Sequence, residues 1–470
     1  GAHVMATHWR NRVPMRQRAA LALALLLALD LSGCATGPRT AARPPDAAVT
    51  RVPDLPRPAD PPAPPRSVDS TPAPVVPTPA PAPAVPGGPG PDGAARARAE
   101  FEEGQALIIR GELARAIASL RSALRLQPDF AEARVSLGLA LYGAGDLDGA
   151  IDELRALLRT RPDLVPARLV LASALMARRD WSAARAELEE ALARRPDSLQ
   201  AYYSLGFVRY ALGDLAGAIA AYRSVLARQP EHHDARYNLA LVLRLAGRDA
   251  EATAEFVAAA EGGVPRAQYF AGAAYATGVG VERDLGAAIA WWFRASEHGV
   301  AQADEALAQM RQTAQGRGRS APGERRAAEQ AFLDFRASLW GQFPDLARDG
   351  SDSAGTALLR SGRAGEAVPV LIREALALSE PAERLLERAY EQGADGVAPH
   401  DPRILGYFGT AAAEGRVRAR LALARIHALG LGVPADVDRA IGLLEATPHE
   451  DAQRLLRELS AASGAIPARP

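Results

Sequence analysis

The chain has 470 residues, of which 48% are hydrophobic, 23% charged and 5% aromatic, and its formal net charge is zero. This length allows two or three domains, and the neutral balance gives no overall attraction to nucleic acid or to an anionic surface. All 55 basic residues are arginine, which excludes chemistry that needs a catalytic lysine or a phosphate-loop lysine. The single cysteine excludes an internal disulfide framework.

The N-terminal segment has the pattern of a secretory signal. Arg16 and Arg18 precede an apolar run over residues 19–29, and a basic segment followed by a short apolar run is typical of a signal peptide. The run is too short for a membrane span, which needs roughly 20 residues. We therefore expect a signal peptide over residues 1–33, with its start at either Met5 or Met15.

The four residues Leu31-Ser32-Gly33-Cys34 match the lipobox pattern, and the chain resembles a bacterial lipoprotein there. The resemblance implies cleavage before Cys34 and lipid chains on that cysteine, and two or more chains anchor a protein stably. Because Ala35 and not aspartate follows the cysteine, the resemblance implies the outer membrane, facing the periplasm. The inner membrane and the cell surface are alternatives, as is an ordinary cleaved signal with a stray cysteine.

Residues 34–93 form a predicted tether between the anchor and the folded body. Residues 38–92 hold 19 prolines and no aromatic side chain. Proline cannot join a helix interior or a central strand, and without large apolar groups nothing offsets the entropy of ordering. We expect a disordered Pro- and Ala-rich segment that reaches on the order of 170 Å.

A regular period begins after the tether. Pro128, Pro162, Pro196 and Pro230 are evenly spaced, and a fixed period of about 34 residues indicates stacked helical hairpins. With repeats starting at 97, 131, 165, 199 and 233, positions 8 and 20 are always glycine or alanine, and position 24 is always large and apolar. Small residues at these positions let the two helices of a hairpin approach closely.

These positions resemble the tetratricopeptide repeat, in five copies over residues 94–266. The family's tryptophan at position 4 is missing from every copy. The resemblance implies an all-α, right-handed solenoid whose first helices line a protein-binding groove. The groove residues that we single out are Tyr142, Met176, Tyr203, Phe207, Tyr210, Tyr237 and Arg244. An alternative is that the chain's own C-terminal repeats cover this groove.

The remainder resembles a related hairpin, the Sel1-like repeat, which has a Gly-x-Gly turn. One copy and a following helix are expected over residues 267–310, with Gly278, Gly280 and Trp292. A linker is expected over residues 311–330, because it is rich in glycine and arginine. Helical repeats should follow over residues 331–463, including two more Sel1-like copies, the first with one inserted residue in its turn.

No catalytic motif or metal-ligand spacing stands out, so we predict a protein that is not an enzyme and that needs no cofactor, metal or small-molecule substrate. The lipobox, tether and mixed repeats resemble scaffold lipoproteins of secretion, pilus or polysaccharide-export machines. We expect a lipid-anchored scaffold that binds envelope proteins and no nucleic acid. The alternative is a regulator that docks to an enzyme of cell-wall synthesis or remodelling.

Overall fold

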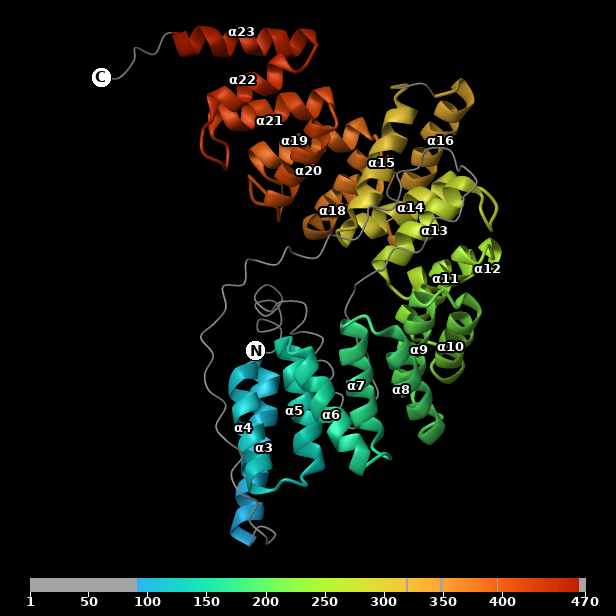
Figure 1. Cartoon of the computed structure of the whole chain (residues 1–470). Helices are drawn as coiled ribbons and strands as arrows, with labels where there is room; N and C mark the ends of the chain where they lie inside the picture. The colour runs from blue at the N-terminus through green and yellow to red at the C-terminus, as the bar shows by residue number, and fades with distance from the viewer. Residues whose placement is uncertain (1–90, 318–319, 347–349, 395, 465–470) are drawn as a thin grey trace, which may run out of the picture. The chain divides into compact units, whose positions relative to one another are not determined.

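The computed structural model describes residues 91–317, 320–346, 350–394 and 396–464. These residues form α-helices and one short 3-10 helix, without a strand among them (Figure 1). The all-α solenoid expected from the sequence is confirmed. The predicted signal peptide, Cys34 and nearly all of the tether lie outside the described residues. The described chain separates into two compact units, unit 1 over residues 91–262 and unit 2 over residues 263–464.

Unit 1 consists of five helical hairpins, each with its two helices packed against one another. Their second helices all begin within the predicted repeats, and four turns place a glycine with positive φ between the two helices. The ten helices are α3 (Pro91–Arg110), α4 (Leu113–Leu126), α5 (Ala131–Ala144), α6 (Leu147–Thr160), α7 (Val165–Ala177), α8 (Trp181–Arg194), α9 (Leu199–Ala211), α10 (Leu215–Arg228), α11 (His233–Leu245) and α12 (Asp249–Glu261).

The small residues at positions 8 and 20 bring the helices together as predicted. A Cβ atom added to Gly138 would lie 2.7 Å from Cγ of Leu154, and one added to Gly206 would lie 2.8 Å from the ring of Tyr222. Position 8 of the first helix therefore packs directly on position 24 of the second. Position 20 is fully buried in the first four repeats and 1% exposed in the fifth, so neither position has room for a larger side chain.

The third hairpin departs from the glycine turn. Gly145 and Gly213 have φ of 88° and 80°, whereas the equivalent residue between α7 and α8 is Arg179, with φ of 64°. Arginine is disfavoured in this left-handed region. The neighbouring Arg178 donates to Asp148 at 2.9 Å and to Asp180 at 3.3 Å, and these bonds help to hold the turn in place.

An arginine occupies position 4 in three repeats, where the family has tryptophan. Arg168 donates to Glu187 at 2.6 Å and to the carbonyl oxygen of Pro162 at 3.0 Å, which joins its own hairpin to the preceding repeat. The second and fifth repeats have the same arrangement. In the fourth repeat position 4 is again aromatic, as Tyr202. Arg228 lies 4.6 Å from the centroid of that ring and donates to the carbonyl oxygen of Pro196 at 3.1 Å. The matching pairs are Arg134 with Glu153 and Arg236 with Glu255.

Unit 2 contains hairpins of a second kind. Its helices are α13 (Pro265–Thr277), α14 (Leu285–Glu297), α15 (Ala301–Ala314), α16 (Pro322–Ser338), α17 (Ala354–Arg360), α18 (Ala364–Leu376), α19 (Glu380–Gln392), α20 (Pro402–Ala413), α21 (Val417–Leu429), α22 (Val437–Glu445) and α23 (Glu450–Gly464), with a 3-10 helix, η1 (Leu339–Gln342).

The linker expected over residues 311–330 is wrong for most of its length. Helix α15 continues to Ala314, and α16 begins at Pro322, where a proline needs no intrahelical hydrogen bond. The Glu324 carboxylate accepts a hydrogen bond from the backbone N–H of Ala321 at 3.3 Å. Helix α16 then buries Phe335, whose ring stacks on Phe293 at 4.4 Å, so this segment belongs to the core of unit 2.

The three Sel1-like turns are of two kinds. Gly278 and Gly430 cap α13 and α21 in the left-handed conformation, with ψ of 20° and 37°. Gly393 after α19 has a similar φ but ψ of 179°, and the connection over residues 393–401 is two residues longer than those over 278–284 and 430–436. The sequence predicted one inserted residue, which is the one between Gly393 and Gly396; the second extra residue lies between Gly396 and Asp401, the N-cap of α20.

Candidate functional site

The predicted groove residues of unit 1 differ in how much surface they leave accessible. Tyr142 on α5 is only 8% exposed. Met176 on α7 is half-buried against the core, and Tyr203, Phe207, Tyr210 and Tyr237 on α9 and α11 are half-buried as well. Arg244 near the end of α11 is exposed. The accessible part of the predicted groove therefore lies in the third, fourth and fifth repeats.

Phe207 and Tyr210 form an aromatic row with a residue that the sequence analysis did not select. The Phe207 ring lies 5.8 Å from Trp181 in an edge-to-face arrangement and 6.5 Å from Tyr210. Trp181 is the first residue of α8 and is itself half-buried. Burial raises the pKa of the Tyr210 phenol, so this side chain remains a neutral hydrogen-bond donor at physiological pH.

Tyr203 is held in place by residues of its own repeat and of the next one. Its ring stacks on His232 at 5.2 Å and meets Tyr222 edge to face at 5.9 Å. The amide Nδ2 of Asn238 donates to the Tyr203 hydroxyl at 2.9 Å. These contacts orient the ring before any partner arrives, which reduces the entropy lost on binding.

His232 is the N-cap of α11. Its Nδ1 accepts a hydrogen bond from the backbone N–H of Ala235 at 3.2 Å, which requires the neutral ring with its proton on Nε2. Burial lowers the pKa of His232, although the charge of Asp234 opposes that shift. The side chain thus couples the start of α11 to the Tyr203 ring.

Tyr237 and Arg244, the last two predicted groove residues, both lie near the ring of Phe256 in the fifth repeat. Tyr237 lies 6.0 Å from Phe256 on α12, and the Arg244 guanidinium lies 5.6 Å from the same ring. The seven predicted residues are therefore spread along successive repeats, with Trp181, His232 and Asn238 as supporting residues. Trp181 could have been selected from its aromatic type, but nothing in the sequence connects it to Phe207.

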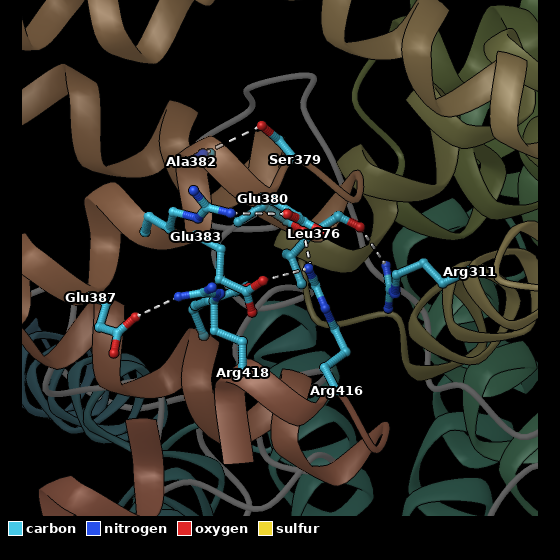
Figure 2. A network of polar contacts seen from close by, with 12 residues as sticks. Arg311, Leu376, Ser379, Glu380, Ala382, Glu383, Glu387, Arg416 and Arg418 are labelled. Carbon is cyan, nitrogen blue, oxygen red and sulfur yellow. Dashed lines mark hydrogen bonds and ion pairs between the residues drawn. The ribbon is translucent and has the colours of Figure 1, made fainter. Parts of the chain in front are cut away.

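Unit 2 contains a buried network of charged side chains (Figure 2). Arg416 donates to the Glu383 carboxylate at 3.1 Å and to the carbonyl oxygen of Ala375 at 2.6 Å. Tyr407 donates to the other oxygen of Glu383 at 2.9 Å. The Arg416 and Glu383 side chains are only 8% and 4% exposed. Burial raises the pKa of Tyr407, so the hydroxyl keeps the proton that it donates.

A second pair extends this network to α15. Arg311 donates from Nε to Glu414 at 2.7 Å, and its Nη2 bonds the other oxygen of the same carboxylate. Its Nη1 also reaches the carbonyl oxygen of Leu376 at 3.4 Å. The paired residues are 103 positions apart. The network therefore connects α15, the end of α18, α19 and the turn between α20 and α21. Its role is to hold these helices together.

Within residues 91–464, apart from the three short gaps, the histidine, cysteine, aspartate and glutamate side chains form no group of three that could hold a metal ion. Over the same residues, none of the helices is both long enough and apolar enough to cross a membrane.

Family models match both kinds of hairpin. Tetratricopeptide-repeat models match residues 101–164, 141–206 and 208–268. The Sel1-repeat model matches residues 265–300 and 417–446, which are the first and third predicted Sel1-like copies. A search of the curated proteins gave no match. Repeats of both kinds indicate interaction with other proteins.

Several solved structures are similar to parts of the chain. A MamA protein is 25% identical over 37% of this chain and 95% of its own, with a TM-score of 0.34. PilF of Pseudomonas aeruginosa is 18% identical over 46% and 99%, with a TM-score of 0.41. The antigen c5321 of uropathogenic Escherichia coli is 19% identical over 79% and 81%, with a TM-score of 0.36. By the repeats that it carries, the chain is an α-solenoid of tetratricopeptide and Sel1 repeats with a protein-binding role.

Proposed function

We propose that the protein is a lipid-anchored scaffold of the bacterial envelope that binds a partner through the groove of its third, fourth and fifth repeats. The observation that carries the proposal is the half-buried aromatic row of Trp181, Phe207 and Tyr210, with ring distances of 5.8 and 6.5 Å. Aromatic side chains supply much contact area and are enriched where proteins bind one another. The partner is an envelope protein, and binding rather than catalysis is the activity.

The supporting contacts favour a groove that is shaped before binding. The Tyr203 ring is fixed by stacking on His232 and by the hydrogen bond from Asn238. Binding energy in such surfaces is concentrated in a few central residues. Phe207 is the central candidate, because its ring contacts both neighbours in the row.

Capture of envelope proteins by purified wild-type protein and variants tests the groove. Phe207→Ala and Tyr237→Ala should each weaken binding by about 1–3 kcal/mol, while circular dichroism shows unchanged helicity. Arg388→Ala, an exposed change on α19, is the control and should bind like wild type. Full capture by both groove variants would contradict the proposal and place the interface elsewhere.

The anchor is tested separately at Cys34, which lies outside the described residues. The lipobox match at residues 31–34 supports the proposal that Cys34 carries lipid and holds the protein on the periplasmic face of the outer membrane. Cys34→Ser should move the protein from the detergent phase to the aqueous phase in detergent partitioning, because two or more acyl chains provide stable anchoring. A variant that remains in the detergent phase would rule out this anchor.

A further inference from the structure

The outer sides of α4 and α6 carry four exposed arginines at repeated positions. Arg121 and Arg155 occupy position 25 of the first and second repeats, and Arg125 and Arg159 occupy position 29. Residues four apart lie on one side of a helix, and equivalent positions of successive repeats line up along a solenoid. We call these four residues the arginine face.

These guanidinium groups lack the partners that most arginines of unit 1 have. Arg115 pairs with Glu112 at 2.5 Å, and Arg134 pairs with Glu153 at 3.2 Å. By contrast, none of the four arginines makes an ion pair with a carboxylate of the described residues. Asp152 on α6 is the one exposed acid between positions 20 and 29 of these two helices. The face therefore carries a clear local excess of positive charge, despite the zero net charge of the chain.

The helix dipole explains only part of this pattern. Arg125 and Arg159 lie in the last turns of α4 and α6, where a cation is favoured. Arg121 and Arg155 lie one turn earlier, beyond the reach of that effect. The face also ends abruptly, since position 25 of the third repeat is Glu189, which accepts from Arg209 at 3.1 Å.

We infer that the arginine face binds a bilayer surface of anionic phospholipid headgroups. The accessible residues beside these arginines on α4 and α6 include the small side chains of Ala118, Ser122 and Ala156. Small side chains supply neither a large apolar contact for a protein partner nor aromatic rings on which bases could stack. A broad charged surface needs neither, and each arginine near such a surface strengthens binding about fivefold.

The place of the face in the chain fits this partner. It lies in the first two repeats, which directly follow the segment proposed to lead from the lipid anchor. A tether raises the effective concentration of a weak second site. The inference rests on the proposed anchor only for how the face reaches a membrane, because headgroup binding itself needs no lipid on Cys34.

Vesicle flotation of the full chain carrying Cys34→Ser tests the inference without the anchor. The chain should float with vesicles of phosphatidylglycerol and phosphatidylethanolamine, and not with phosphatidylcholine alone. The combined change R121Q/R125Q/R155Q/R159Q should lower the partition coefficient by roughly 600-fold, about fivefold for each arginine. Added salt should lower wild-type binding as well, because exposed charges are screened.

A matched control removes the same charge elsewhere. R326Q/R388Q/R439Q/R457Q alters four exposed arginines of unit 2 and should leave the partition coefficient within about twofold of wild type. All proteins share one N-terminal segment, so their differences report the substituted arginines alone. The inference is overturned if both quadruple variants lose binding equally, if neutral vesicles bind as well, or if the face binds duplex DNA and not vesicles. A negative result for vesicle binding would not contradict the proposed groove or the proposed anchor, since partner capture and detergent partitioning test those separately.

Discussion

Unit 1 and unit 2 both stack helical hairpins in which a small residue meets a large side chain, as Gly272 meets Trp292 in unit 2, but only unit 2 adds a buried network of charged pairs to this packing among the described residues. In unit 1 glycine or alanine at position 8 meets a large side chain at position 24, as Gly138 meets Leu154. In unit 2 the buried pair of Arg416 and Glu383 and the pair of Arg311 and Glu414 connect helices far apart in the chain. Unit 1 is thus stabilised between neighbouring repeats, whereas unit 2 combines such packing with contacts of long sequence separation.

This difference predicts how far the loss of stability from one substitution spreads through each unit. In a quasi-linear array each repeat is stabilised mainly by its neighbours, so a local defect remains local. A network that joins α15 to the α20–α21 turn should instead transmit the loss of one side chain through unit 2. Amide hydrogen exchange, read fragment by fragment, measures both behaviours in the full chain.

The largest effect is expected from Glu383→Ala. It leaves the Arg416 guanidinium buried without its carboxylate, and breaking a buried pair in this way costs about 3–5 kcal/mol. Exchange should increase across α15 and α18–α21, with unit 1 unchanged. Glu387→Ala, one turn later on α19, is the matched control, because its partner Arg418 is 41% exposed and such pairs contribute about 1 kcal/mol or less. Equal effects of the two changes would contradict a special role for the buried pair.

An intermediate effect is expected from Ala218→Leu on α10. Ala218 is fully buried, and adding three carbons there should overpack the fourth hairpin at a cost of about 1–3 kcal/mol. Exchange should increase in α9 to α11 and remain unchanged in α3 to α6. Ala220→Leu, on the exposed side of the same helix, should have little effect. Loss of protection throughout unit 1 would show that the array behaves as one cooperative block.

The smallest effect concerns pH and His232. Burial holds the folded-state pKa of His232 below its ordinary value of about 6.5, so the unfolded chain takes up the proton first. The stability that this histidine contributes is complete above that value and is lost as pH falls through the folded-state pKa. Because protonation also removes the Nδ1 acceptor, the start of α11 should lose about 1 kcal/mol or less.

The variant His232→Asn isolates the pH-dependent contribution of His232 to stability, since asparagine caps a helix well and does not titrate. Protection of the Ala235 amide, compared between pH 7.5 and pH 5, should fall more in wild type than in the variant. An identical fall in both proteins would assign the pH dependence to other groups.

Much of unit 1 could be predicted because its packing rules repeat in the sequence. The even spacing of Pro128, Pro162, Pro196 and Pro230 sets the hairpin boundaries, and the small residues at positions 8 and 20 follow from close helix contact. The arginine at position 4 is a missed signal of the same kind. Arg134, Arg168 and Arg236 each precede a glutamate at one constant spacing, and this regular spacing by itself indicates the pairing.

The sequence by itself therefore determined the helical hairpins of unit 1 and where their helices meet, because local periodicity encodes them, while the list of groove candidates came from the resemblance to the tetratricopeptide repeat and stays a prediction. Tertiary structure decided that Tyr142 is buried while Phe207 keeps accessible surface, that His232 caps a helix against Tyr203, and that Arg311 reaches Glu414. It also placed most of the expected linker in helices. Helix α16, which begins within that segment, buries Phe335. Contacts between residues so far apart in the chain leave no periodic trace in it, and burial depends on neighbours that only the folded chain supplies.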